Sequence, residues 1–239
     1  MIDRERLGQD EPQRFIPFLT NEVTNVAKLY ASVFAGEPWN EVTRCGCGKF
    51  FGAETEVGQD CECFKSKLAE AYPLAETIGY IKKELGRTDA KGFTMKEGTE
   101  VVGFSWGFPY QSPNQFSFDK YRTPEMRGGM SELLAQNGVD SKFFYFSECG
   151  VDSNSRGKGY SNKLSGSLVN VARWAGLPLI MRTNAQSPMI AVADRFNMTQ
   201  LMGPQAEIDR EQREIKVTDT IVNDVLDLEN PDRVLFMLR

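Results

Sequence analysis

The chain has 239 residues, enough for one large domain or for one domain with a small insert. Apolar residues make up 41% and charged residues 26%, so a fibrous class and extensive disorder are excluded. The net charge of -5 makes nucleic acid an unlikely partner, since the chain lacks an overall basic field, and it fits a cationic small substrate better.

No hydrophobic targeting or membrane segment is visible. Residues 1–13 are polar and charged, and no apolar run approaches the roughly 20 residues that a membrane span needs. We therefore expect a cytoplasmic protein without a membrane partner.

The sequence contains no histidine. Ser-His-Asp and Cys-His catalysis, His-ligated zinc hydrolysis and histidine general bases are therefore excluded within this chain. A proton acceptor must be a carboxylate, Tyr, Lys, Cys or a relayed water.

The first half of the chain predicts helices around an insert. Apolar residues at helical spacing predict an amphipathic helix over residues 20–34. A cysteine-rich insert follows over residues 44–64, and then a second helix over residues 65–85 that Pro73 breaks or restarts. The patterns at residues 92–96 and 100–108 predict an antiparallel hairpin.

The second half alternates strands and helices. Residues 110–140 predict a long loop, either functional or flexible, with a short helix over 124–136. After it we expect a strand at 142–151, a helix at 160–175, a strand at 177–183, a helix at 187–196 and two further strands, the clearer at 234–238. This order indicates an α/β (α+β) fold with a mixed sheet.

Four cysteines form two close pairs in the insert. Cys45-x-Cys47 is followed, after thirteen residues, by Cys61-x-Cys63. Four soft thiolates suit tetrahedral Zn²⁺, and in a cytoplasmic chain such pairs are more often metal sites than disulfides. The usual zinc spacing is Cys-x-x-Cys, so an iron–sulfur centre or free redox thiols remain alternatives. Four protein ligands leave no open position, which predicts a structural role.

A glycine loop, VDSNSRGKGYS at residues 151–161, precedes the helix predicted at residue 160. A phosphate-binding P-loop is excluded because Lys158 is followed by Gly159, and the dinucleotide fingerprint is excluded because position 162 is Asn. The N–H groups of residues 157–161 remain suited to binding one anion at a helix N-terminus, and the two glycines let it approach closely.

The loop and its flanks resemble a known signature. Arg156-Gly-Lys-Gly-Tyr-Ser161, after a strand that ends in Glu148-Cys-Gly-Val151, is similar to the acetyl-CoA motif Gln/Arg-x-x-Gly-x-Gly/Ala of the GNAT N-acetyltransferase superfamily. Arg156 and Gly159 match, whereas Ser161 departs. The resemblance implies a GNAT-like, mainly antiparallel mixed sheet flanked by helices in a single domain over residues 1–239, with a zinc-knuckle insert.

The same resemblance implies a cofactor site between two splayed strands. Main-chain groups of Cys149 and Val151 would pair with the pantetheine arm of acetyl-CoA, and Asn184 would lie near it. The pyrophosphate would be bound by Arg156, Gly157, Lys158, Gly159, Tyr160 and Ser161.

Glu148 is the candidate general base, and its alternative is a structural carboxylate paired with a cation. The Tyr that commonly protonates the leaving thiolate corresponds here to Ala193, so Ser187, Tyr145 or solvent remain candidates. Cys149 is interpreted as a buried structural cysteine because no histidine could activate it.

These observations predict acetyl transfer from acetyl-CoA to a primary amine of a small molecule or peptide, by direct attack of the amine. The alternative is a non-enzymatic CoA sensor, or a protein-interaction module built on the knuckle. A homodimer is compatible with the sequence. Four aromatic residues are candidates for an acceptor wall, although a core position is the simpler interpretation: Trp39, Trp106, Phe108 and Tyr110.

Overall fold

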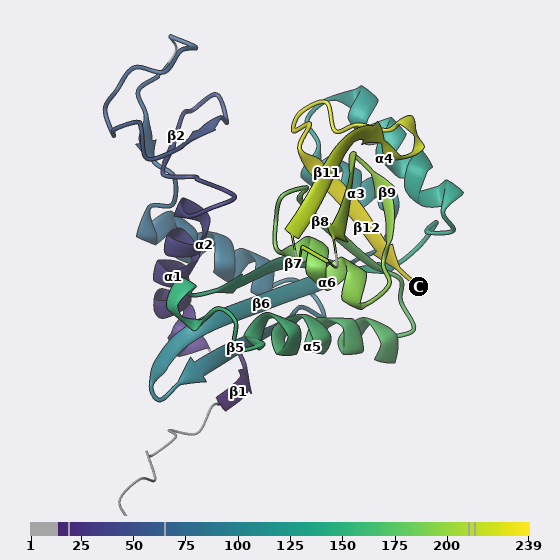
Figure 1. Ribbon diagram of the computed structural model, residues 1–239, viewed down its shortest axis with the longest axis horizontal. Helices are drawn as coiled ribbons and strands as arrows, with labels where there is room; N and C mark the ends of the chain where they lie inside the picture. Colours follow the sequence, from purple (N-terminus) through teal and green to yellow (C-terminus); the bar gives the residue numbers. More distant parts are fainter. Residues whose placement is uncertain (1–13, 19, 65, 210, 213) are drawn as a thin grey trace, which may run out of the picture.

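A seven-stranded sheet forms the centre of the molecule (Figure 1). The computed structural model describes residues 14–239 except 19, 65, 210 and 213. Across the sheet the strands are β1 (Arg14–Pro17), β5 (Lys91–Glu97), β6 (Glu100–Tyr110), β7 (Phe143–Val151), β8 (Leu179–Asn184), β12 (Arg233–Leu238) and β9 (Thr199–Met202). Only β7 and β8 are parallel, so the predicted mixed, mainly antiparallel sheet is confirmed.

Helices cover both faces of this sheet. One face carries α1 (Val23–Ala35), α2 (Leu74–Leu85), α3 (Pro113–Lys120) and α4 (Pro124–Gln136), and the other carries α5 (Tyr160–Trp174) and α6 (Met189–Arg195). Alternate residues of β6 form the core under the first face. Phe104 and Trp106 pack against α1 and α2, and Phe108 and Tyr110 pack against α3 and α4. No helix in the described ranges combines the length and apolar character needed to cross a bilayer.

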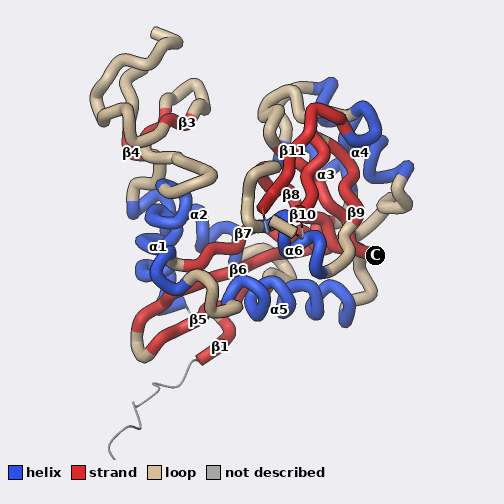
Figure 2. Tube along the Cα trace, in the orientation of Figure 1, coloured by secondary structure: helices blue, strands red, loops and turns tan. Residues whose placement is uncertain are grey.

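The insert is a small three-stranded sheet joined by long loops, and it projects beyond the α1–α2 end of the molecule (Figure 2). Its strands are β2 (Thr43–Arg44), β3 (Phe50–Phe51) and β4 (Ala69–Glu70), in the order β3-β2-β4. The helix predicted from residue 65 was wrong at its start, because residues 69–70 pair with β2 and the helix begins only after Pro73.

Two other regions contain more structure than the sequence predicts. The long loop expected over residues 110–140 contains α3 as well as α4, with Ser112 accepting a hydrogen bond from the Gln115 N–H at the start of α3. The described C-terminal part has four strands instead of two. Besides β9 and β12 it contains the hairpin of β10 (Pro204–Asp209) and β11 (Glu214–Ile221), whose Ala206 and Ile208 pack beside α6.

Candidate active site and metal centre

Strands β7 and β8 separate part-way along their length. They pair only over three positions, from Phe144 opposite Leu179 to Phe146 opposite Met181. Beyond Phe146, β7 pairs with β6 alone, and beyond Met181, β8 pairs with β12 alone. The strands therefore open a gap, and the edge of β7 that faces it has peptide groups available to a ligand.

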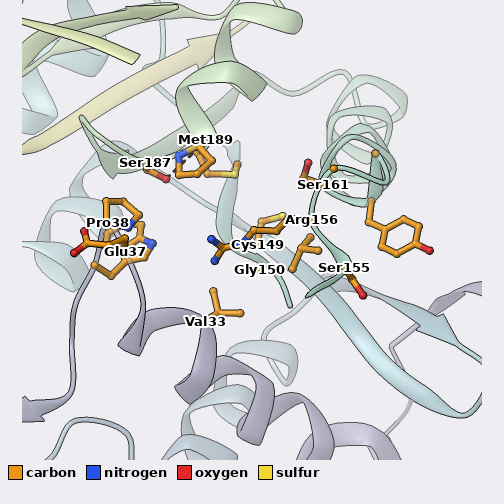
Figure 3. Close-up of a pocket in the computed structure, with 16 residues that line it drawn as sticks. Val33, Glu37, Pro38, Cys149, Gly150, Ser155, Arg156, Ser161, Ser187 and Met189 are labelled. Carbon is orange, nitrogen blue, oxygen red and sulfur yellow. Dashed lines mark hydrogen bonds between the residues drawn. The ribbon is translucent and has the colours of Figure 1, made fainter. Parts of the chain in front are cut away.

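A pocket of about 240 Å³ lies in this gap beside the glycine loop, and we call it the loop pocket (Figure 3). Its wall comes from the end of β7, the glycine loop, the end of α1 with the following segment, and the start of α6. The predicted cofactor residues on this wall are Cys149, Val151, Arg156, Gly157, Gly159, Tyr160 and Ser161.

The glycine loop presents its backbone to the pocket. Gly157 and Gly159 have φ angles of 81° and 78°, in the left-handed region that glycine tolerates best. A Cβ added to either glycine would meet no other atom within 4 Å, so the space beside them is open. The N–H groups of Gly157, Gly159 and Ser161 have no hydrogen-bond acceptor among the described residues. An anion at the N-terminus of α5 would satisfy them.

A second pocket, of about 190 Å³, adjoins the first, and we call it the carboxylate pocket. The two pockets share Trp39, Cys149 and Met189. Its other polar lining residues are Tyr30, Glu41, Tyr72, Lys120, Tyr145, Ser147, Glu148, Arg182, Thr183 and Arg233. A molecule in the loop pocket and one in the carboxylate pocket can therefore meet beside Cys149.

Glu148 enters the carboxylate pocket because β7 has a bulge. Trp106 pairs with Glu148 and Gly107 with Phe146, which leaves Ser147 as an extra residue. Ser147 and Glu148 consequently face the same side of the sheet, toward α1 and α2.

Two tyrosines hold the Glu148 carboxylate. Tyr80 of α2 donates to its Oε1 at 2.8 Å, and Tyr30 of α1 donates to the same oxygen at 3.3 Å. Burial, together with the nearby charge of Glu84, raises the pKa of Glu148 to about 7, while the Tyr80 hydrogen bond acts in the opposite direction. A carboxylate with this pKa exchanges protons near neutral pH, as a general base must.

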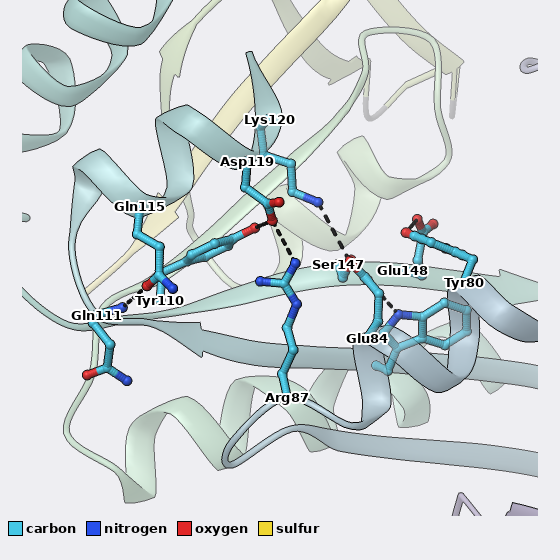
Figure 4. A network of polar contacts seen from close by, with 11 residues as sticks. Tyr80, Glu84, Arg87, Tyr110, Gln111, Gln115, Asp119, Lys120, Ser147 and Glu148 are labelled. Atoms are coloured by element: carbon cyan, nitrogen blue, oxygen red, sulfur yellow. Dashed lines mark hydrogen bonds and ion pairs between the residues drawn. The ribbon is translucent and has the colours of Figure 1, made fainter. Parts of the chain in front are cut away.

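Behind Glu148, the buried side chain of Glu84 forms the centre of a polar network (Figure 4). It accepts hydrogen bonds from Trp106 Nε1 at 3.0 Å and Ser147 Oγ at 2.5 Å, and Lys120 Nζ lies 3.9 Å away. The sequence prediction missed Glu84. The sequence feature that could have indicated Glu84 is its position three residues after Ile81, on the apolar side of α2.

The four cysteines of the insert come together as predicted. Their sulfur atoms all lie within 4.8 Å of one another, and the Cys45 and Cys63 sulfurs are 3.4 Å apart. Tetrahedral zinc with Zn–S bonds of about 2.3 Å places its sulfurs about 3.8 Å apart, so the cluster fits this ion.

Each cysteine pair forms the same turn. The Cys47 N–H points to Cys45 Sγ at 3.3 Å, and the Cys63 N–H points to Cys61 Sγ at 3.5 Å. Gly48 and Phe64 close the two turns, and both have positive φ. Amide groups directed at sulfur stabilise thiolates, the form that binds a metal.

Three solved structures that share the fold of this chain are N-acetyltransferases. A polyamine N-acetyltransferase of Drosophila melanogaster has 11% identity and a TM-score of 0.54, over 95% of this chain and 100% of its own. An N-acetyltransferase from Staphylococcus aureus has 13% identity and a TM-score of 0.51, over 95% and 98% of the two chains. Arylalkylamine N-acetyltransferase 2 of Aedes aegypti has 13% identity and a TM-score of 0.51, over 94% and 97%.

The chain has the GNAT fold. No protein-family model and no curated protein matches the sequence. At these identities the similarity lies in the three-dimensional arrangement of the chain.

Two of the residues that the GNAT resemblance suggested for cofactor binding do not line the loop pocket. Lys158 Nζ forms an ion pair with Glu97 at 2.6 Å, on the outer side of the glycine loop. The Asn184 Oδ1 atom accepts a hydrogen bond from the Gln186 N–H at 2.8 Å and shapes the turn before α6.

The tyrosine expected of many GNAT enzymes has no counterpart on α6. Ala193, which occupies the expected position, is buried in the core. Of the other candidates, Ser187 lines the loop pocket and Tyr145 lines the carboxylate pocket. The side chain of Cys149 is part-buried and lines both pockets, so the prediction of a buried cysteine was wrong, while desolvation raises the pKa of its thiol to about 12 and disfavours the thiolate.

The aromatic residues considered for an acceptor wall have different positions. Trp106, Phe108 and Tyr110 are fully buried in the core, whereas Trp39 lines both pockets. The other aromatic residues of the carboxylate pocket come from α1, from the insert and the segment after it, and from β7: Tyr30, Phe34, Phe50, Tyr72, Tyr145 and Phe146.

Proposed function

We propose that this chain is an acetyl-CoA-dependent N-acetyltransferase that acetylates a primary amine by direct attack. One observation carries the proposal: the glycine loop and the Glu148 carboxylate line two pockets that meet at Cys149, in the gap between β7 and β8. The fold shared with N-acetyltransferases supports it.

The loop pocket would hold the cofactor. The free N–H groups of residues 157–161 would bind its pyrophosphate, with the positive end of the α5 dipole behind them. The unpaired edge of β7 at Cys149 and Val151 would bind the pantetheine amides. This assignment uses backbone groups that have no other partner in the described chain.

The carboxylate pocket would hold the acceptor. Most amines are protonated at neutral pH and must lose a proton before they attack, and Glu148 has a pKa suited to accepting it. The amine nitrogen then forms a bond to the acetyl carbon, the carbon–sulfur bond breaks, and the thiolate of CoA takes up a proton. Ser187 or solvent can supply that proton.

The cysteine cluster would bind one structural Zn²⁺. Four thiolate ligands leave no open coordination position, so we assign the ion no chemical step. Its proposed effect is to hold the insert, and with it Phe50 and Tyr72, at the wall of the carboxylate pocket.

The absence of the expected tyrosine, replaced by Ala193, favours one rival: a sensor that binds acetyl-CoA without transferring its acetyl group. A screen of amine acceptors that measures the release of free CoA separates the two functions. The enzyme releases CoA with at least one acceptor, and Glu148→Gln slows that release. A sensor binds acetyl-CoA yet releases none above the hydrolysis background with any acceptor.

A further inference from the structure

The carboxylate pocket contains more positive charge than an acceptor with only an amine would need. Lys120, Arg182 and Arg233 line it together with two carboxylates, Glu41 and Glu148. Burial raises the pKa of both carboxyls, that of Glu148 to about 7, so the negative charge of Glu148 is partly lost near neutral pH. The pocket thus differs in sign from the chain as a whole, which has a net charge of -5.

The three cations differ in how their charge is compensated. Arg182 forms an ion pair with the buried Asp227, which leaves its charge neutralised within the protein. The Lys120 Nζ atom lies 3.9 Å from a carboxylate oxygen of Glu84, which is a long ion-pair distance. The same carboxylate also accepts hydrogen bonds from Trp106 and Ser147. Lys120 is therefore only partly compensated.

Arg233 is the least compensated of the three. Its guanidinium has no ion-pair partner within the described residues and lies 4.6 Å from the centre of the Trp39 ring. Burial, followed by the charge of Arg182, lowers the pKa of Arg233, while the charges of Glu41 and Glu148 act in the opposite direction. A partly buried guanidinium with no ion-pair partner is stabilised when an anion joins it. Trp39 also lines both pockets, so Arg233 lies close to the point where they meet.

We propose that the acceptor is a small amine that also bears a carboxylate, such as an amino acid, with the carboxylate bound by Arg233 and its amine directed to Glu148. The inference rests on the proposed function. Arginine is suited to this role because its planar guanidinium can donate two parallel hydrogen bonds to a carboxylate. Lys120, on α3, provides a second positive charge in the same pocket.

The size of the pocket agrees with a small acceptor. Its volume of about 190 Å³ is below the roughly 300–1,000 Å³ typical of sites for drug-sized ligands. A folded protein substrate would have to insert a single terminal residue, whereas a free amino acid fits within the walls formed by Tyr30, Trp39 and Tyr72.

Matched acceptors that differ only in the carboxylate test this inference. Arginine is compared with agmatine, ornithine with putrescine, and phenylalanine with phenethylamine, each by the kcat/KM of CoA release. We expect at least one amino acid to exceed its decarboxylated partner by about 10–100-fold, the range expected for hydrogen bonds to a charged group. Equal or better use of the decarboxylated amine in all three pairs would overturn the inference.

Arg233→Gln then tests the residue. The variant should lower the amino acid's kcat/KM by about 10-fold or more, mostly through KM, and change that of the decarboxylated amine much less. The ratio of the two kcat/KM values, amino acid over decarboxylated amine, cancels any effect of the variant on folding or on Glu148 that both acceptors share. Arg233→Lys, which keeps the charge, should retain part of the preference, and Arg173→Gln on the exposed end of α5 should retain all of it. An equal loss for both acceptors in Arg233→Gln would contradict the assignment.

A binding experiment separates this inference from the proposed function. Ligand-observed NMR with the CoA-loaded protein measures the same acceptor pairs without any turnover. Amino acids that bind better than their partners, with binding weakened in Arg233→Gln, support the inference even if no acetyl transfer occurs, in which case the proposed function fails alone. Equal binding within every pair refutes the inference and leaves acetyl transfer standing.

Discussion

The hydroxyl of Tyr80 donates to the carboxylate of Glu148 at 2.8 Å and so joins α2 to β7 across 68 residues of sequence. Through this contact α2 lowers the pKa of Glu148, the residue proposed to take the proton from the acceptor. The charge of Glu84, one turn further along α2, acts on Glu148 in the opposite direction.

The first prediction concerns pH. The pKa of Glu148 is about 7, so the carboxyl is protonated and inactive as a base well below pH 7 and ionised above it. We expect kcat/KM to rise with pH and to level off above pH 7, with a midpoint near that value. Glu148→Gln should lose this limb and lower kcat by about 10²–10⁴-fold. An unchanged profile in the variant would assign the base to another group.

The second prediction concerns the two α2 residues. Loss of the Tyr80 hydrogen bond in Tyr80→Phe removes an interaction that lowers the Glu148 pKa, so the midpoint should move to higher pH. Loss of charge in Glu84→Gln removes an interaction that raises it, so the midpoint should move to lower pH. Steady-state pH profiles measure both shifts. Variants that merely loosened the site would change rates without moving the midpoint in opposite directions.

Tyr30→Phe is the control for the tyrosine variant. Its hydroxyl contacts the same Glu148 oxygen at 3.3 Å instead of 2.8 Å, and it is not among the main influences on the Glu148 pKa. We expect a smaller shift of the midpoint than in Tyr80→Phe. A larger shift would show that Tyr80 is not the principal donor.

The third prediction concerns the cysteine cluster. Purified protein should contain one zinc per chain, and Cys61→Ser should lower that content while Cys149→Ser keeps it, because Cys149 lies on β7 outside the cluster. Elemental analysis measures both. Iron in place of zinc, together with the absorbance of an iron–sulfur cluster, would show that the assignment of zinc is wrong.

The fourth prediction concerns what the metal supports. The insert supplies Phe50 to the carboxylate pocket, and Tyr72 follows directly after its last strand, whereas the loop pocket is lined by no residue between 40 and 148. Chelation should therefore raise the KM for the acceptor and leave the Kd for acetyl-CoA nearly unchanged. Loss of acetyl-CoA binding on chelation would contradict this division.

Local sequence patterns predicted much of the fold. The helix over residues 124–136 was predicted with the bounds it has as α4, where Thr123 accepts a hydrogen bond from the Met126 N–H and Pro124 is the first residue. The glycine loop was located because its glycines mark positive φ and its neighbours mark a strand and a helix. The start of α2 was misplaced because Ala69 and Glu70 pair with β2 and Lys67 pairs with Asp60, and such contacts between distant residues leave no local pattern.

The carboxylate pocket was less predictable. Glu148 could be proposed from its position in an apolar strand. Tyr80, which donates to Glu148, and Lys120 and Arg233, which line the pocket, come from three elements far away in the sequence. Such long-range contacts leave no local pattern, and the bulge at Ser147 that turns Glu148 toward them has no signal in the letters of β7.

The glycine loop provides the last prediction and its matched control. Gly159 and Gly176 both have positive φ and open space around them, but only Gly159 lines the loop pocket. An alanine at either position should cost about 1–2 kcal/mol of backbone strain. Gly159→Ala should also weaken acetyl-CoA binding, whereas Gly176→Ala should not.

Calorimetric titration of acetyl-CoA into the wild type, Gly159→Trp and Gly176→Trp tests the central claim most directly. Thermal unfolding of each variant first establishes that it is folded. We predict one binding site per chain in the wild type and in Gly176→Trp, and no measurable binding in Gly159→Trp, whose indole would fill the loop pocket. No binding by the wild type, or equal binding by all three proteins, would contradict the assignment of the glycine loop to acetyl-CoA.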